Sequence, residues 1–353
     1  MRILVGNSTL DRTGGTQNYT YALAMELKRQ GHAVEYFTFA LGLVSTRLEQ
    51  QGIPFMQHDK YDLILANHIP VCHRLKGLGY IIQTIHGPNV DIEQPSVTAN
   101  AYVAISQEIQ DSLKAKGYDS TVIENGIDCE RFKSTNPLNK KIKYVLSLCQ
   151  SKEANDFIHS CCKEIGIKLI TCNKNTDNVW EIEKLINKAD LVIGIGRSLY
   201  DAMACGRCVL SFDIRPYLGK ALGDGYLNSH NIEQSVYYNC SGRGTGREFT
   251  KEMLIEEIQK YNYVDGEYNR AYALKNLNIK TSINKYIQIL PPTAKNSLTF
   301  PNNYESAYIQ NIFVERNNLK KQKERIKKIC YLLIGLCIST LLIICILLIL
   351  LFL

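Results

Sequence analysis

The segment from Ala189 to Leu210, ADLVIGIGRSLYDAMACGRCVL, constrains the fold of this chain more than any other stretch. The apolar run Leu191-Val192-Ile193 ends at Gly194-Ile195-Gly196, and Cys208–Phe212 is apolar again. Between them the spacing predicts a short amphipathic helix over Leu199–Cys205. A strand, a glycine turn, a helix N-terminus and a second strand form a βα unit. Its exposed N–H groups and positive dipole end suit a phosphate, which indicates a nucleotide-type ligand.

Two simpler interpretations of this segment stay open. Strand-glycine-helix turns occur throughout α/β proteins, and Gly194-x-Gly196 lacks the third glycine of the dinucleotide fingerprint. Asp201, on the first turn of the predicted helix, could accept hydrogen bonds from ribose hydroxyls beside the phosphates. The same carboxylate could instead only complement the helix dipole.

Strand and helix patterns alternate along most of the chain. The expected strands of the first half are Arg2–Val5, Val34–Phe39, Asp62–Leu65, Ile81–Ile85, Tyr102–Ile105 and Thr121–Ile123, with helices at Thr16–Gln30 and Gln107–Lys116. After the polar segment 134–141 the pattern restarts, with strands at Lys143–Leu148, Ile167–Ile170 and Leu191–Ile195 and helices at Glu153–Ile165 and Val179–Lys188. Such alternation predicts an α/β fold of two Rossmann-like, doubly wound domains that bind ligands at the carboxyl ends of their strands. We expect these domains at residues 1–136 and 137–290, since 353 residues with 45% apolar content can supply two cores.

The cysteines predict a reducing environment for the folded part. There are twelve, without the spacing of a disulfide framework, and no signal peptide precedes the strand-like Met1–Val5. Cys205 and Cys208 have the spacing of a redox motif. We expect both to be buried apolar residues, because they lie at the end of a predicted helix, where the dipole raises a thiol pKa.

The C-terminal 25 residues, Ile329–Leu353, contain no charge, Pro, Asn or Gln, and 18 of them are Leu, Ile or Phe. At ~1.5 Å per residue a helix of this length reaches ~37 Å, which is enough to cross a ~30 Å hydrocarbon core. The segment therefore predicts a transmembrane helix rather than a buried core helix.

A basic segment comes just before this span. It carries six basic residues and Glu324, a net charge of +5 out of +7 for the whole chain. The basic residues are Lys320, Lys321, Lys323, Arg325, Lys327 and Lys328. By the positive-inside rule this charge belongs at the membrane surface and not on nucleic acid. We therefore expect a single-pass, tail-anchored protein with its folded domains in the cytoplasm and a linker over residues 291–328.

An ordered set of short motifs resembles the GT-B glycosyltransferases of the family 4 type over roughly residues 1–290. It comprises Gly14-Gly15 before a helix, Lys28–Val34, Thr84-Ile-His86, Val103–Ser106, Val122–Asp128 with Phe132, and Asp201–Gly206. The resemblance implies a retaining, metal-independent transfer of a sugar from a nucleotide-sugar donor, with no bound cofactor.

The resemblance also implies site residues. Lys152 corresponds to the family's phosphate-binding lysine, and His86 to its histidine near the transferred sugar. Arg197, together with these two, is a candidate catalytic residue. The candidate donor-binding residues are Gly14, Gly15, Lys152, Ser198, Leu199 and Asp201, the Ser198 and Leu199 contributions being backbone N–H groups. An ordinary turn at Gly14-Gly15, a solvated Lys152 and a structural His86 remain alternatives.

Three departures from the family pattern matter. Of the family's two glutamates separated by seven residues, Asp201 matches the second with a shorter side chain. No residue matches the first, and Arg197 occupies that region. The family's Gly-Arg before its phosphate lysine reads Cys149-Gln150 here, so one cation is missing unless Arg197 or Arg243 substitutes.

The sequence therefore predicts a membrane-anchored glycosyltransferase that acts on a lipid-linked or membrane-associated glycan acceptor. Two alternatives remain open. One is a catalytically inactive GT-B-like binding or scaffold subunit, and the other is a GT-B-like sugar-nucleotide epimerase or hydrolase.

Overall fold

The computed structural model describes residues 1–173, 177, 179–215, 219–291 and 325. The chain divides into two compact units. The first comprises Met1–Met56 and Lys60–Leu298 and holds all the helices and strands given below. The second comprises Gln57–Asp59 and Thr299–Leu353, most of which lies outside the described residues.

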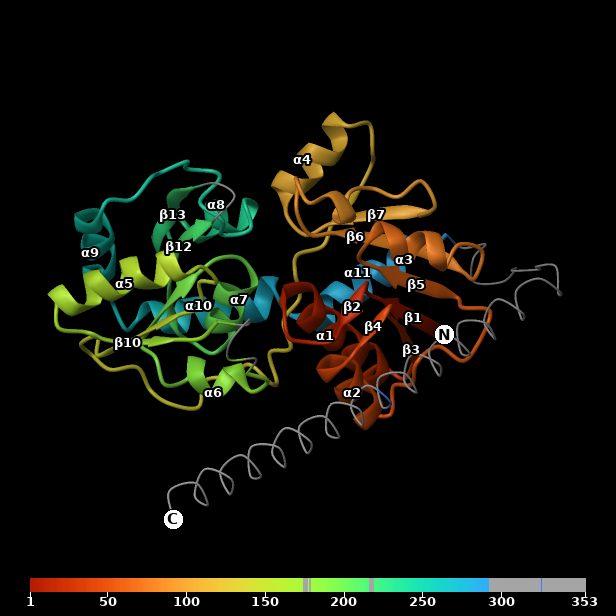
Figure 1. The fold of residues 1–353 in the computed structure, drawn as a ribbon, viewed down its shortest axis with the longest axis horizontal. Helices are drawn as coiled ribbons and strands as arrows, with labels where there is room; N and C mark the ends of the chain where they lie inside the picture. The colour runs from red at the N-terminus through yellow and green to blue at the C-terminus, as the bar shows by residue number, and fades with distance from the viewer. Residues whose placement is uncertain (174–176, 178, 216–218, 292–324, 326–353) are drawn as a thin grey trace, which may run out of the picture. The chain divides into compact units, whose positions relative to one another are not determined.

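The first sheet has six parallel strands in the order β3-β1-β5-β6-β7-β8 (Figure 1). Its strands are β1 (Arg2–Gly6), β3 (Ala33–Phe37), β5 (Leu63–Ala66), β6 (Tyr80–Ile85), β7 (Ala101–Ala104) and β8 (Thr121–Val122). The connecting helices are α1 (Gly15–Arg29), α2 (Leu43–Gln50), α3 (Ile69–Arg74), the 3-10 turn η1 (Asp91–Glu93) and α4 (Gln107–Ala115), and β2 (Thr9–Leu10) pairs with β4 (Ala40–Leu41). Every residue of β5 is buried, as expected for a strand covered on both faces.

The second sheet has five strands in the order β10-β9-β11-β12-β13. The strands are β9 (Tyr144–Ser147), β10 (Lys168–Thr171), β11 (Leu191–Gly194), β12 (Cys208–Arg215) and β13 (Lys220–Leu227), and the helices are α5 (Lys152–Glu164), α6 (Ile182–Ile186), α7 (Arg197–Ala204), α8 (Ile232–Tyr237), α9 (Lys251–Gln259) and α10 (Asp265–Asn276). The last strand, β13, runs antiparallel to β12, whereas the other pairs are parallel.

Alternate residues of β11 show that this sheet is covered on both faces. Leu191 and Ile193 belong to an apolar cluster with residues of α5 and α9. Val192, between them, belongs to a second cluster with residues of α7 and α10. A continuous apolar run is what a strand buried on two sides requires.

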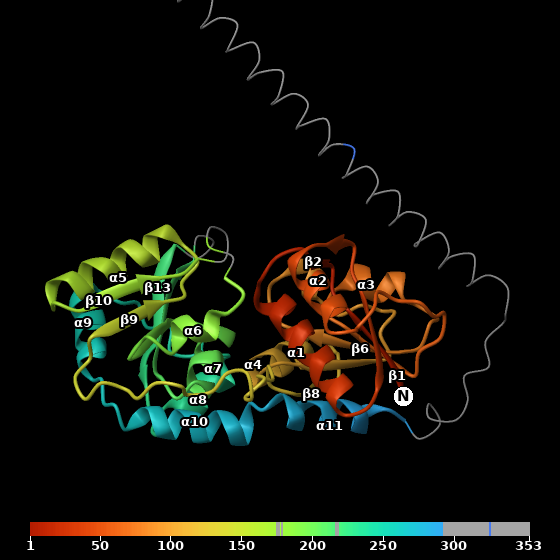
Figure 2. The same ribbon diagram turned by 90° about the horizontal axis from the view of Figure 1, so that it is seen from below.

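The last described helix, α11 (Ile279–Ile289), packs against α1 and so belongs with the first sheet (Figure 2). The hydroxyl of Tyr286 lies 2.7 Å from that of Tyr19 on α1 and 2.7 Å from that of Thr84 on β6. The predicted bounds of the second domain, 137–290, thus include a helix that packs beside the first sheet.

Gly126 lies where the chain leaves the first sheet, and α11 packs directly against it. A Cβ at this position would lie 2.6 Å from Ile279 Cδ1 and 2.9 Å from Ile279 Cα. We therefore expect Gly126→Ala to lower the free energy of unfolding by about 1–3 kcal/mol, measured by urea denaturation. Gly15→Ala is the control, because a Cβ there meets no atom within 4 Å. Equal stability of the two variants would contradict the prediction.

The predicted burial of Cys205 and Cys208 agrees with the structure. The nine described cysteines are free and buried. Burial raises the pKa of Cys205 and of Cys208 to about 12 in each case, so both thiols are protonated at neutral pH.

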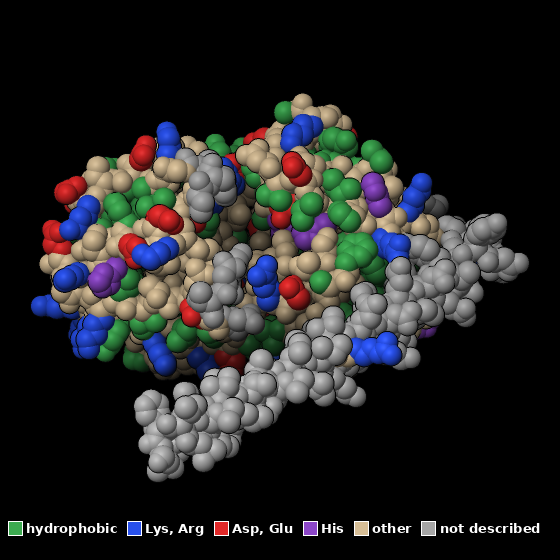
Figure 3. All heavy atoms as spheres, in the orientation of Figure 1, with side chains coloured by type: hydrophobic (Ala, Val, Ile, Leu, Met, Phe, Trp, Pro, Cys, Tyr) green, Lys and Arg blue, Asp and Glu red, His purple; other side chains and the backbone are tan. Residues whose placement is uncertain are grey.

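The parallel α/β architecture predicted from the sequence is confirmed, whereas the predicted membrane span, Ile329–Leu353, lies outside the described residues. Among the residues that are described, no helix is both long and apolar enough to cross a bilayer. On the face drawn in Figure 3, Lys and Arg side chains are interspersed with Asp and Glu side chains. The charge of that face is therefore mixed in sign.

Candidate functional site

A cavity of about 110 Å³ lies at the N-terminal ends of α1 and α7. Its lining comes from the turn before α1, the segments that follow β9 and β10, the start of α6 and the first turns of α7. The lining residues are Thr13, Gly14, Gly15, Asn18, Leu148, Gln150, Cys172, Val179, Ile182, Arg197, Ser198 and Asp201. Four of the predicted donor-binding residues, Gly14, Gly15, Ser198 and Asp201, are thus brought together with Arg197, one of the predicted catalytic residues.

The two helices that meet at this cavity both begin at a glycine cap without a side chain. Gly14 caps α1, and Gly196 caps α7 with a φ of +55°, which favours glycine. Helices α4, α5 and α9 differ, because their caps Ser106, Ser151 and Thr250 accept a hydrogen bond from their own first turn. Because glycine has no side-chain acceptor, first-turn amides of α1 and α7 are left to bond to other acceptors. A bound anion would provide such acceptors.

Of the two backbone amides predicted to bind the donor, those of Ser198 and Leu199, only one is well placed in the first turn of α7. The Leu199 and Tyr200 amides donate to Gly196 O, the Leu199 bond being 3.0 Å long. The amides of Arg197 and Ser198 precede these first intrahelical bonds. Because Leu199 is also fully buried and does not line the cavity, the Ser198 amide is the better placed of the two predicted donors.

Arg197 is buried, with a side chain only 7% exposed, and it ties α7 to the segment that leaves the first sheet. Its Nη1 donates to Asn125 Oδ1 at 3.2 Å and to Gly126 O at 3.0 Å. Its Nε has no hydrogen-bond partner within the described part of the chain. The Arg197 guanidinium is therefore fixed through Nη1, while its Nε–H is left without an acceptor among the described residues.

Asp201 lies one helical turn after Arg197, and its Oδ1 is 3.7 Å from Arg197 Nε. This Oδ1 is also buried without a hydrogen-bond partner among the residues that the structure describes. Burial raises the pKa of Asp201 to about 6, while the Arg197 guanidinium acts in the opposite direction. A buried donor and a buried acceptor left side by side are costly, which indicates a polar ligand that bonds to both.

His86 lies at the carboxyl end of β6 and does not line this cavity. Its Nε2 lies 2.8 Å from Asn67 Oδ1, and the Asn67 amide nitrogen donates to Gly6 O and Thr20 Oγ1. His86 must therefore carry its proton on Nε2, which leaves Nδ1 as an acceptor. Burial, with smaller effects of His68 and Arg197, lowers the pKa of His86 to about 3, so the ring is neutral at pH 7.

This pKa makes the stability of the wild-type protein fall in acid. Below pH 6.5 His86 is protonated in the unfolded chain, whereas in the folded chain it is protonated only below about pH 3. We expect the stability of His86→Gln, relative to wild type, to rise by about 1.4 kcal/mol per pH unit as the pH falls from 6.5. Urea denaturation at pH 7, 6 and 5 measures this difference. A difference that stays constant with pH would show that His86 titrates normally in the folded protein.

The two other predicted cations make ion pairs away from the cavity. Lys152 is 83% exposed and pairs with Asp156 on the same helix. Arg243 makes a two-pronged ion pair with Glu108 of α4 through Nε and Nη2 at 2.6 and 2.5 Å. Neither residue lines the cavity, so Arg197 is the cationic side chain that the structure places in its lining.

Sequence reasoning missed the role of Asn125. The Val122–Asp128 motif gave Asn125 no role of its own, but its side-chain oxygen accepts a hydrogen bond from Arg197 Nη1. Gln150 and Asn18, which line the cavity, were also missed as site residues. A polar residue in a predicted loop gives no signal for a partner more than 70 positions away.

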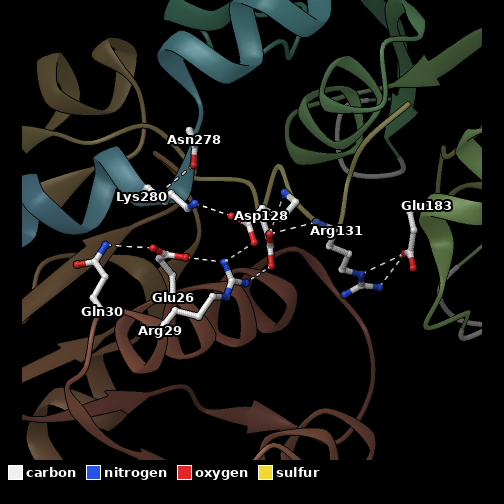
Figure 4. A network of polar contacts seen from close by, with 9 residues as sticks. Glu26, Arg29, Gln30, Asp128, Arg131, Glu183, Asn278 and Lys280 are labelled. Carbon is white, nitrogen blue, oxygen red and sulfur yellow. Dashed lines mark hydrogen bonds and ion pairs between the residues drawn. The ribbon is translucent and has the colours of Figure 1, made fainter. Parts of the chain in front are cut away.

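A polar network fixes the connection that follows Asn125 (Figure 4). Asp128 pairs with Arg29 of α1, and its Oδ1 accepts the Glu130 and Arg131 amides. Arg131 in turn pairs with Glu183 of α6 at 2.9 Å. Charged side chains thus link the connection to α1 and α6, both of which contribute residues to the lining of the cavity.

Comparison with known proteins supports the fold. No protein-family model matches the sequence, and no curated protein matches it significantly. Among solved structures, AviGT4, a glycosyltransferase involved in avilamycin A biosynthesis, is similar with a TM-score of 0.50 and 11% identity, over 84% of this chain and 98% of that one. MurG of Acinetobacter baumannii is similar at a TM-score of 0.45 and 12% identity, over 81% and 99% of the two chains. The chain therefore has the two-sheet fold of the GT-B glycosyltransferases, as its motifs predicted.

Proposed function

We propose that this chain is a glycosyltransferase that moves a sugar from a nucleotide-sugar donor to an acceptor at a membrane. The observation that carries the proposal is the cavity between two glycine-capped helix N-termini, in which Arg197 Nε and Asp201 Oδ1 have no hydrogen-bond partner among the described residues. The fold shared with AviGT4, a glycosyltransferase, supports it.

The groups that line the cavity are chemically suited to bind a donor diphosphate and its ribose. The amides at the starts of α1 and α7 would bind diphosphate oxygens. Asp201 would accept a hydrogen bond from a ribose hydroxyl, and Arg197 Nε would donate to the same group. In the transfer, the acceptor hydroxyl oxygen replaces the diphosphate oxygen on the anomeric carbon, and the hydroxyl proton passes to the leaving diphosphate. The charge that develops on the leaving diphosphate would be stabilised by the amides and by the buried guanidinium.

Membrane attachment is the second part of the proposal. Its basis is the apolar sequence of Ile329–Leu353 and the basic residues before it. The loop after β6 adds an observation from the structure, because Val90, Ile92 and Val97 are 46%, 47% and 83% exposed there. Apolar side chains gathered on one loop suit a lipid-linked acceptor or a bilayer surface.

The test is transfer by the full-length protein in lipid vesicles. We would incubate it with labelled nucleotide sugars carrying uracil, guanine, adenine or thymine bases and with a lipid extract. Gly15→Ala is the sharpest variant, because Gly15 lines the cavity and its added methyl meets no protein atom within 4 Å. We expect wild type to transfer label to lipid, and Gly15→Ala to transfer much less with unchanged stability. No turnover of any donor would contradict the proposal.

We further propose a retaining reaction that needs no metal ion. Excess chelator should leave initial rates nearly unchanged, because helix amides and Arg197 would carry the diphosphate charge. Lys152→Ala tests whether Lys152 breaks its ion pair with Asp156 and binds the donor. If it does, the variant should have a severely lowered transfer rate. Activity abolished by chelator and restored by Mg²⁺ or Mn²⁺ would contradict metal independence.

A catalytically inactive binding subunit is the second candidate. It is favoured by the ion pairs of Lys152 with Asp156 and of Arg243 with Glu108, which hold both cations outside the cavity. Nucleotide binding without donor turnover in the same vesicle assay would identify such a subunit. Release of nucleotide without transfer to lipid would instead indicate a hydrolase or epimerase.

A further inference from the structure

A second group of polar residues lies at the carboxyl ends of neighbouring strands of the first sheet, outside the cavity described above. Ser8 follows β1, His68 follows β5, and Glu93 lies in η1 after β6. These strands are adjacent in the order β1-β5-β6 and run parallel. Their carboxyl ends therefore bring the three residues to one edge of the sheet.

The proton of His68 can be placed from its contacts. The Ser8 amide donates to His68 Nδ1 at 3.2 Å, so Nδ1 carries no hydrogen. Burial lowers the pKa of His68 to about 4, which keeps the ring neutral at pH 7. The one ring proton is therefore on Nε2, and this N–H has no acceptor within hydrogen-bond distance among the described residues. Glu93 Oε1 lies 4.0 Å from it.

Glu93 faces His68 with a carboxylate that no described residue hydrogen-bonds. Its side chain is 13% exposed. Its Oε2 lies against the backbone of Gly87, the residue after His86, where a Cβ would be only 2.9 Å away. Burial raises the pKa of Glu93 to about 7. His68 Nε2–H and Glu93 Oε1 therefore offer a donor and an acceptor 4.0 Å apart, neither of which makes a hydrogen bond to a described residue.

We propose that His68 and Glu93 bind one hydroxyl group of the sugar acceptor, an inference that rests on the proposed transfer function. The hydroxyl oxygen accepts the proton of His68 Nε2–H, and the hydroxyl hydrogen is donated to Glu93 Oε1. With 4.0 Å between the two atoms, one oxygen can lie about 2.8 Å from each. Both residues are positioning residues in this arrangement.

The charge of the pair selects the class of ligand. A neutral imidazole and a carboxyl group carry at most one negative charge between them, so the pair favours a neutral hydroxyl over a phosphate or a carboxylate. The part of the chain that the structure describes holds no group of three His, Cys, Asp or Glu residues that could bind a metal ion. The geometry therefore points to a polyhydroxyl acceptor at this edge of the sheet.

The test uses the full-length protein in detergent micelles with ¹⁵N-labelled histidine. The probes are methyl glycosides of glucose, galactose, mannose and N-acetylglucosamine. We expect at least one of them to shift the His68 ring signals, which the His68→Gln variant identifies. In Glu93→Gln that glycoside should bind about tenfold more weakly, because a hydrogen bond to a carboxylate is lost. Glu248→Gln, at an exposed position, is the matched control and should bind like wild type.

Two outcomes would overturn the inference. If no glycoside shifts the His68 signals, or if Glu93→Gln binds as tightly as wild type, the gap holds only a water molecule. Nucleotide binding is measured on the same samples by calorimetry and should be equal in wild type and Glu93→Gln. If wild type binds no nucleotide, the proposed function is contradicted. The glycoside measurement does not depend on that result.

Discussion

Replacing Arg197 with Met should lower the free energy of unfolding at pH 7 by about 3–5 kcal/mol, because it breaks a buried charge pair and leaves its partners unpaired. Asp201 would lose its cation, which lies 3.7 Å away. Asn125 Oδ1 and Gly126 O would lose their shared donor. The loss arises at the contact between α7 and the connecting segment, so urea denaturation of the whole chain should show it.

Three further variants make this prediction specific. Arg197→Lys should recover only part of the stability, since a single ammonium does not reproduce the guanidinium fork that reaches both Asn125 and Gly126. The double variant Arg197→Met with Asp201→Leu should recover most of it, because no buried charge remains. Arg243→Met is the matched control, at a side chain that is 23% exposed, and should cost much less. A loss below 1 kcal/mol for Arg197→Met would show that water already reaches the pair.

The sequence predicted the parts of the fold that are decided locally. The strand, glycine turn and helix around Gly196 were expected at nearly the observed bounds, with α7 starting at Arg197 and not at Leu199. The periodicity of apolar residues and the glycine cap both depend on only a few adjacent residues of the sequence. The same turn places Ser198 and Asp201 in the lining of the cavity.

Features that depend on distant residues were not predicted. The antiparallel course of β13 is set by its pairing with β12 and not by its own pattern. The return of α11 to the first sheet depends on Tyr286 meeting Tyr19, more than 260 residues earlier. Lys152 was expected at the donor from motif spacing alone, but spacing says nothing of Asp156, which pairs with it one turn later.

Replacing Asp201 with Asn should weaken binding of the donor nucleotide about ten- to hundredfold and leave the fold intact. The lost interaction is a hydrogen bond from a ribose hydroxyl to a carboxylate, worth ~1.5–3 kcal/mol. Stability should fall less than in Arg197→Met, because Asn125 and Gly126 keep their hydrogen bonds from the guanidinium although Arg197 loses its carboxylate partner. Isothermal titration calorimetry with UDP, GDP, ADP and dTDP, alongside urea denaturation, separates the two effects. Asp156→Asn, at an exposed carboxylate on α5, is the matched control.

The pH dependence of binding provides an independent check on the same residue. In wild type the carboxyl group of Asp201 gains a proton as the pH falls through about 6, so nucleotide affinity should fall with it. In Asp201→Asn no such group titrates, so the ratio of wild-type to variant affinity should shrink toward one between pH 7 and pH 5. Titration of the nucleotide's own phosphate affects both proteins equally and cancels in the ratio. A ratio that stays constant over this range, or equal affinities at pH 7, would remove Asp201 from the donor site and leave the helix amides to bind the nucleotide without it.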